Sequence, residues 1–244
     1  MSMDKWLYVA IGCVGLAAHP GRANADAPVR DLDERTLQEK YHIAPTEEGL
    51  IGALQHREGL VRSFAALKLA ENRDKNAIAP ILAALAAESQ EGTRIILATA
   101  AAQLGADQGL NALRSMCEDR SWSPTLRMVA AQGMVSFLGR QDCLSDVLEV
   151  LRSEPDDHQA SFGALNLLTY SWLKQAPPGQ LDEIRALAAL YLKSPDSMLR
   201  IAAGACIRNH GGPSAITQLR AAIDVEQESA VRESLEKDVL SVRQ

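Results

Sequence analysis

Aromatic residues are scarce in this sequence, at 4% of its 244 residues, although apolar residues of all kinds reach 47%. Alanine and leucine therefore have to supply most of the interior. Both are strong helix formers, whereas β-strands favour the β-branched and aromatic residues. The composition predicts an all-α chain, and its length is sufficient for a sizeable core.

Basic residues are also fewer than acidic ones. Lys and Arg number 25 against 31 Asp and Glu, so the formal net charge is −6, and the basic residues form no run. Proteins that bind a phosphate backbone need clustered Lys and Arg. Nucleic acid is therefore not an expected partner.

The first 25 residues have the pattern of a secretory signal peptide. Lys5 precedes the apolar run Trp6–Ala18, whose 13 residues are too few to span a membrane comfortably. His19–Gly21 would break a helix, and Ala23–Ala25 places small residues where a signal peptidase reads the chain. We predict cleavage after Ala25 and a periplasmic or secreted mature chain. The alternative is an uncleaved N-terminal anchor, which would be the only contact with a membrane.

Cysteine is also rare, and cleavage would leave only Cys117, Cys143 and Cys206. An odd number leaves at least one thiol unpaired. Cys117 is predicted to end one helix and Cys143 to begin the equivalent helix of the next repeat. Equivalent helices of a stack run parallel, which would hold the two thiols too far apart to bond. We predict no disulfide, with Cys206 as a small buried apolar residue.

What the sequence does contain is a repeat of 32 or 33 residues. Its unit is clearest in Ser194–His210, where a turn leads to an apolar residue followed by Arg, small residues follow three and four positions later, and Gly closes the helix. The Arg recurs with this phase, except that Gln159 replaces it in the fourth unit and a nine-residue insertion separates Gln159 from Arg200. A repeat of this length is typical of stacked helix pairs. The repeat Arg residues are Arg62, Arg94, Arg127, Arg200 and Arg232.

This pattern predicts a capping helix and linker over residues 26–45 and one repeat domain over residues 46–244. The capping helix should cover Arg30–Tyr41. Six antiparallel helix pairs should follow, at Thr46–Gln55 with Gly59–Glu71, Asn76–Glu88 with Gly92–Leu104, Gln108–Glu118 with Pro124–Leu138, Cys143–Arg152 with Asp156–Lys174, Leu181–Leu192 with Asp196–Asn209, and Ser214–Ile223 with Ser229–Val242.

The turn, the apolar–Arg pair, the Ala-Ala or Ala-Gly pair and the closing Gly resemble HEAT repeats, in particular the HEAT-like repeats of phycobilin lyases. The resemblance covers roughly Thr46 to Val242, although the family's Asp in the turn is clear only at Asp196. It implies a right-handed α-solenoid whose inner helices line a concave face that holds a partner.

The groups that could carry chemistry are scattered. His42, His56, His158 and His210 lie at predicted turns or helix ends of different repeats, while a metal site needs converging ligands. Gly211-Gly212 lacks the Lys and Ser or Thr of a phosphate-binding loop. We expect no metal, no cofactor and no enzymatic activity.

The fourth repeat is the most irregular and supplies the candidate partner-binding residues. It carries Asn166 at a core position and ends in Tyr170 and Trp172, two of the chain's seven Trp and Tyr residues. Trp122, in the turn of the third pair, is the fourth candidate. Aromatic residues are favoured anchors at interfaces. The alternative is that Tyr170 and Trp172 fill the gap made by a nine-residue insertion.

The repeat Arg residues also have two interpretations. They could form a ladder for anionic partners, but their position in the first turn of each inner helix favours bonds that hold neighbouring repeats in register. The function that follows is a non-catalytic scaffold for a protein or peptide partner in the cell envelope. The alternatives are a bilin-lyase-like enzyme, which the resemblance permits, and a purely structural envelope component.

Overall fold

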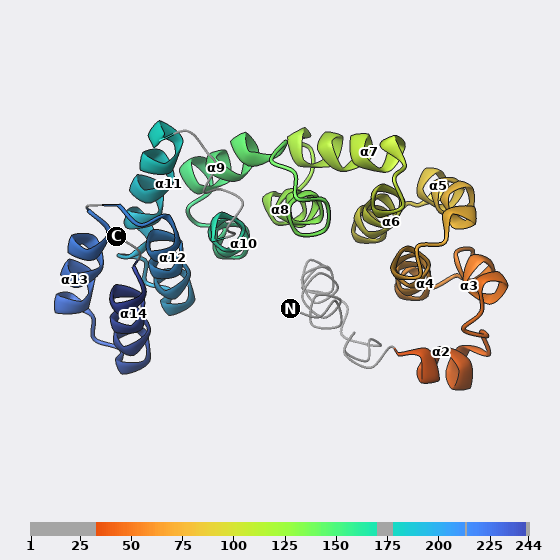
Figure 1. Ribbon diagram of the computed structural model, residues 1–244, viewed down its shortest axis with the longest axis horizontal. Coiled ribbons are helices and arrows are strands. Elements are labelled where there is room, and N and C mark those ends of the chain that lie inside the picture. The colour runs from red at the N-terminus through yellow and green to blue at the C-terminus, as the bar shows by residue number, and fades with distance from the viewer. Residues whose placement is uncertain (1–32, 170–177, 213, 243–244) are drawn as a thin grey trace. The chain divides into compact units, whose positions relative to one another are not determined.

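A computed structural model describes residues 33–169, 178–212 and 214–242 of the chain (Figure 1). Those ranges contain 13 α-helices and no strand, which confirms the all-α prediction of HEAT-like helix pairs. No helix within them combines the length and the apolarity needed to cross a membrane. The predicted signal peptide, residues 1–25, lies outside the described ranges.

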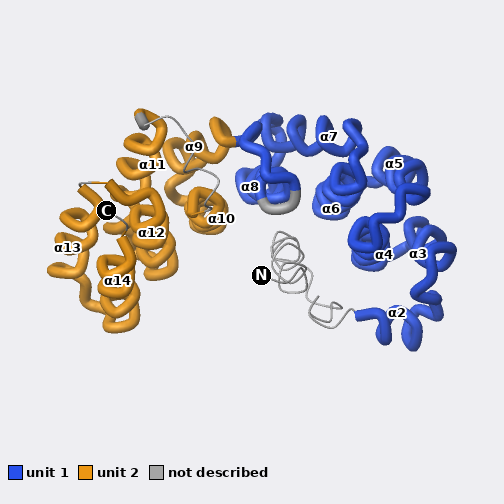
Figure 2. Tube along the Cα trace, in the orientation of Figure 1, with its two compact units in different colours: residues 1–143 blue, residues 144–244 orange. Residues whose placement is uncertain are grey.

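The chain divides into two compact units, residues 1–143 and 144–244 (Figure 2). Unit 1 begins with the cap α2 and contains three helix pairs. Side-chain oxygens of Asp33 and Thr46 cap α2 and α3 by accepting from backbone N–H groups at 2.7 and 3.2 Å. The helices are α2 (Glu34–Tyr41), α3 (Glu47–Ala53) with α4 (Gly59–Glu71), α5 (Ile78–Ala87, after the 3₁₀ turn Lys75–Ala77) with α6 (Glu91–Gln103), and α7 (Asp107–Glu118) with α8 (Pro124–Gln132), which continues as the π-helical turn Gly133–Phe137.

Unit 2 contains the other three pairs. Asp157 and Asp196 cap α10 and α12 by accepting hydrogen bonds from backbone N–H groups at 2.9 and 2.8 Å, and Asp196 is the turn residue singled out in the sequence. Residues 170–177, which hold the predicted end of the fourth inner helix, are outside the described ranges. The helices are α9 (Leu144–Ser153) with α10 (His158–Leu168), α11 (Pro178–Tyr191) with α12 (Ser197–His210), and α13 (Ala215–Val225) with α14 (Ser229–Ser241).

Small residues on the inner helices form the interior of each unit. The positions three and four residues after the repeat Arg are fully buried in α4, α6 and α8, and these helices carry Ala66, Ala98 and Ala131 at the second of the two. In unit 1, α4 packs on α6, and in unit 2, α12 packs on α14. A methyl side chain at the contact lets two helix axes approach closely. The positions that recur in the sequence repeat are thus the positions that are buried in the core.

The approach of α7 to α6 depends on Gly109. A Cβ atom built at Gly109 would lie 2.6 Å from the carbonyl oxygen of Ala98 and 2.6 Å from the backbone nitrogen of Ala102. Backbone atoms cannot rotate out of the way as a side chain can. Gly52 in α3 is also helical, but a Cβ there would meet nothing within 4 Å.

We predict opposite effects for the same substitution at these two glycines. Gly109→Ala should lower the free energy of unfolding by about 1–3 kcal/mol through overpacking. Gly52→Ala should raise it by about 0.5–1 kcal/mol, because alanine is the better helix former. Urea titrations of both variants test this. Stabilisation by Gly109→Ala would contradict the close packing of α6 and α7.

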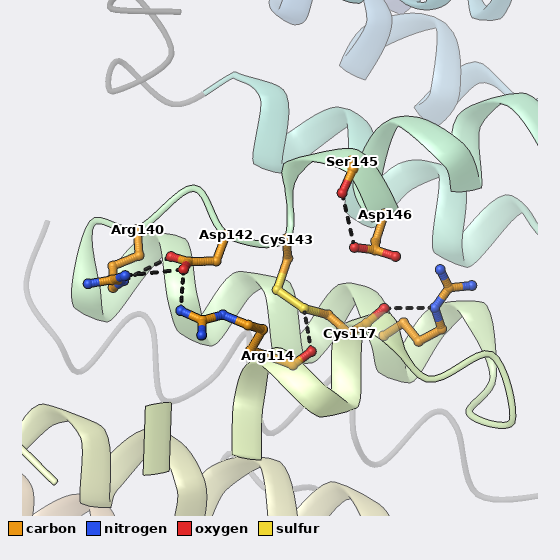
Figure 3. Close-up of a disulfide and its surroundings, with 8 residues drawn as sticks. Arg114, Cys117, Arg140, Asp142, Cys143, Ser145 and Asp146 are labelled. Carbon is orange, nitrogen blue, oxygen red and sulfur yellow. Dashed lines mark hydrogen bonds and ion pairs between the residues drawn. A yellow bond between two sulfur atoms is a disulfide. The ribbon is translucent and has the colours of Figure 1, made fainter. Parts of the chain in front are cut away.

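Cys117 and Cys143 form a disulfide, so the prediction that they are too far apart was wrong (Figure 3). Their Cα atoms lie 6.1 Å apart. The prediction assumed that equivalent helices of neighbouring repeats run parallel, which would place the two cysteines at opposite ends. Instead, α7 runs across the view in Figure 1, whereas α6 and α8 are seen close to end-on. The chain leaving the π-helical turn therefore returns past the last turn of α7, where Cys117 lies.

Charged groups hold the same return segment on α7. Asp142 forms ion pairs with Arg114 of α7 and with Arg140, whose Nε lies 2.8 Å from the carboxylate (Figure 3). The hydrogen bond from Arg140, reinforced by Arg114, lowers the pKa of Asp142 to about 2. Arg127 of α8 donates from Nε to the carbonyl oxygen of Cys117 at 3.0 Å. Cys206 remains a free, buried thiol, and its burial raises its pKa to about 12.

The disulfide should contribute about 3 kcal/mol to stability, given a loop of 26 residues. A reducing agent should lower the denaturation midpoint of the wild type and of Cys206→Ala by the same amount. It should not affect the double variant Cys117→Ala with Cys143→Ala. Titration of thiols in the denatured, unreduced mature chain should find one. Three reactive thiols would contradict the bond.

Candidate protein-interaction surface

Arg62 ties the first helix pair to the second. Its Nε and Nη2 atoms bind Oε2 of Glu88 at 2.7 and 2.6 Å, and its Nη1 donates to the carbonyl oxygens of His56 and Arg57 at 2.6 and 3.0 Å. Glu88 follows α5, and its second oxygen accepts from the backbone N–H groups of Ser89 and Gln90. One carboxylate thus closes its own turn and holds the guanidinium of the preceding pair.

The same arrangement recurs in unit 2. Nε of Arg200 donates to Oε2 of Glu226 at 2.7 Å. The two residues are 26 positions apart in the sequence, the same spacing as Arg62 and Glu88. Nη1 of Arg200 donates to the carbonyl oxygens of Ser194 and Pro195, and Glu226 accepts from the backbone of Gln227 and Glu228. These bonds raise the pKa of Arg200 and lower that of Glu226, so both stay charged at neutral pH.

The other repeat Arg residues make different contacts. Arg232 donates to the carbonyl oxygen of Glu226, six residues earlier, and Arg127 donates to the carbonyl of Cys117. Arg94 lies over the indole ring of Trp122, 5.5 Å from its centroid. The carboxylate that closes this turn is Asp119, which accepts from Ser121 and is one methylene shorter than Glu88. The longer turn places Trp122 where the Arg–Glu tie would be.

In the fourth repeat, where Gln159 replaces the Arg, Tyr191 of α11 links the fifth helix pair to the fourth. Its hydroxyl donates to the carbonyl oxygen of Leu151 in α9 at 2.9 Å and lies 3.1 Å from the hydroxyl of Ser161 in α10. Tyr191 is buried at the end of α11, and this burial raises its pKa. Sequence reasoning missed this residue, because no repeat position marks it.

The predicted partner-binding residues lie in different parts of the chain. Trp122 is 9% exposed and packs under Arg94 in unit 1. Asn166 is half-buried on α10 in unit 2. Tyr170 and Trp172 lie outside the described ranges. The arrangement around Trp122 therefore serves packing between α6 and the α7–α8 turn.

An exposed apolar face on α5 was also missed. All ten residues of this outer helix are apolar, and Ala79, Ala83, Ala86 and Ala87 are exposed along one stripe, beside the half-buried Leu82. The neighbouring outer helices α3 and α7 instead expose polar residues such as Glu48 and Asn111. The signal was the absence of any polar residue between Asn76 and Glu88.

Comparison with known proteins identifies the class to which this architecture belongs. A family model described as HEAT repeats matches residues 47–134, the part of unit 1 that carries the Arg62–Glu88 tie and the face of α5. Residues 47–134 of this chain therefore consist of HEAT repeats.

Among solved structures, an engineered protein determined by crystallography is similar at 18% sequence identity and a TM-score of 0.46, over 80% of this chain and 95% of that one. A comparison with curated proteins found no match.

The Arg–Glu tie gives a stability prediction. Side-chain exposure is 14% for Arg62 and 2% for Glu88, so Glu88→Ala would leave a largely buried guanidinium without its carboxylate. We expect a loss of about 3 kcal/mol in the free energy of unfolding. Glu39→Ala removes the partner of Arg35 in an exposed pair and should cost less than about 0.5 kcal/mol. Equal losses in denaturant titrations would show that the tie is no stronger than a surface pair.

Proposed function

We propose that this protein is a non-catalytic scaffold, exported across a membrane and cleaved after Ala25, that holds a protein or peptide partner. HEAT repeats generally mediate protein–protein interaction, which supports the scaffold. The Cys117–Cys143 disulfide supports export, because disulfides persist in oxidising compartments such as the periplasm. The periplasmic or secreted location therefore rests on two independent features, the N-terminal pattern and the disulfide.

The apolar face of α5 carries the scaffold proposal. Contiguous apolar surface on a monomer marks an interaction site when polar residues surround it. Here the exposed alanines and Leu82 lie between helices whose exposed residues include Glu47 and Glu48 of α3 and Asp107 of α7. This charge pattern suits a partner protein that presents an apolar patch with basic residues at its rim. The ties between successive pairs would hold the face rigid, which reduces the entropy lost on binding.

Cross-linking and capture of the mature protein from cells test this proposal. We expect one stoichiometric partner with the wild type, and Ala83→Glu with Ala86→Glu should lower its recovery at least tenfold while the melting temperature changes by less than about 2 °C. The matched control is Ala186→Glu with Ala221→Glu, which charges exposed alanines of the outer helices α11 and α13.

Recovery of the partner by the α5 variant at the wild-type level would contradict this surface. Recovery of no partner by the wild type would contradict the scaffold and favour a purely structural component. Mass measurement of the captured protein should give a chain beginning at Asp26. A chain beginning at Met1 would show that the N-terminal segment is retained as an anchor.

A further inference from the structure

Four inner helices of this protein, α4, α6, α8 with its π-helical turn, and α12, are followed by a residue with positive φ. At the ends of α6, of the π-helical turn after α8, and of α12 this residue is a glycine: Gly105 (φ 94°), Gly139 (φ 63°) and Gly211 (φ 56°). At the end of α4 it is Arg73, with φ 56°. The repeat spacing from Arg73 to Gly105 is 32 residues, so the two positions are equivalent.

The backbone at Arg73 makes the same closing bonds as the backbone at Gly105. The N–H of Arg73 donates to Ala70 and that of Asp74 to Leu69, at 3.0 and 3.1 Å. At α6, Gly105 donates to Ala102 and Ala106 to Ala101, both at 3.0 Å. Glycine is the usual residue at this position because a Cβ atom makes the left-handed conformation unfavourable. Strained residues of this kind are often found at binding sites, and His42 at the end of α2 is the other non-glycine residue with positive φ in the described part of the chain.

Arg73 lines a cavity between the ends of α4 and α6. The cavity has a volume of about 470 Å³, in the range of small-ligand sites. Apolar side chains of Ala70 and Leu104 line it together with polar or charged ones. The lining residues are Ala70, Glu71, Arg73, Lys75, Gln103 and Leu104.

Two cationic side chains at this cavity, Arg73 and Lys75, have no bonded partner among the described residues. Glu71 is already paired with Lys68, at 2.9 Å. The side chains of Arg73 and Lys75 make no hydrogen bond or ion pair with any residue in the described ranges, and both are exposed. The closing backbone bonds take up the carbonyl oxygens of Leu69 and Ala70 in α4 and of Ala101 and Ala102 in α6. In a chain of net charge −6, two adjacent unpaired cations beside an apolar lining fit an anionic ligand with an apolar group.

We propose that this cavity binds the C-terminal end of a partner polypeptide. The terminal carboxylate lies between Arg73 and Lys75, and the last side chain packs on Ala70 and Leu104. A C-terminal residue carries its carboxylate and its side chain on the same carbon, which matches cations and apolar groups in one small cavity. The amide of Gln103 serves the peptide backbone. The inference rests on the proposed scaffold function and names the chemistry of a partner at a second surface, apart from α5.

Arg73→Gly separates binding from stability. Glycine restores the usual residue at the left-handed position, so the melting temperature should rise by about 2–4 °C. The same change removes one cation of the site, so affinity for a carboxylate should fall at least about tenfold. An arginine with only a structural role would lower the melting temperature on substitution and leave binding unchanged.

The probe is acetyl-Gly-Ser-Gly-Leu-Leu with a free C-terminal carboxylate, titrated into the mature protein and followed by NMR chemical shifts. We expect shifts confined to residues near Ala70 and Leu104, and binding at least about tenfold weaker for the C-terminal amide of the same peptide. Lys75→Gln should weaken binding without raising the melting temperature, and Arg73→Lys should retain part of it. Arg57→Gln removes an exposed cation before the other end of α4 and should have no effect.

Equal binding of the acid and the amide would overturn the proposal, as would wild-type affinity in Arg73→Gly or the absence of any shift. These failures are distinct from failure of the scaffold function. Capture of a partner that depends on α5 and survives Arg73→Gly would leave the scaffold standing and refute this cavity alone. Shifts produced equally by acetate at the same concentration would show that a free carboxylate suffices and would overturn the role of a peptide.

Discussion

The bond from an inner-helix arginine to a glutamate of the next pair is the constraint on which this structure depends. Arg62 with Glu88 and Arg200 with Glu226 use the same spacing, the same guanidinium atoms and the same two turn carbonyls, in two separate units. Each glutamate also closes the turn that follows its own outer helix. Alanine side chains are too small to interdigitate, so an interior built from alanine does little to fix the register of neighbouring helices. A charged bond with fixed geometry supplies it.

Much of the fold could be predicted from the sequence because the repeat phase and the burial phase coincide. Ala66 and Ala98 were assigned to the core by their offset from an arginine, and both are fully buried. Turn residues such as Asp196 and closing residues such as Gly105 fixed most helix ends to within a few positions. The glutamate 26 residues after the arginine was visible in the sequence as well, although only the structure shows that it is the arginine's partner.

What sequence reasoning could not supply depends on helix directions and on which residues are left uncovered. The disulfide was missed because α7 crosses its inner helix, and no residue pattern in Asp107–Glu118 encodes that crossing. The candidate site was predicted from the aromatic residues, yet Trp122 is packed under Arg94. The two surfaces proposed to bind a partner differ from their equivalents in the other repeats by lacking a feature: α5 lacks polar residues, and the end of α4 has Arg73 where α6 has a glycine. Each becomes informative only beside its equivalents in the other repeats.

A double-mutant cycle at Arg62 and Glu88 tests the central claim most directly. The free energy of unfolding is measured for the wild type, Arg62→Met, Glu88→Gln and the double variant. If the tie sets the register, the two single losses should exceed the double loss by more than about 1 kcal/mol. If the losses add to within about 0.5 kcal/mol, the two side chains act independently and the tie does not hold the repeats together.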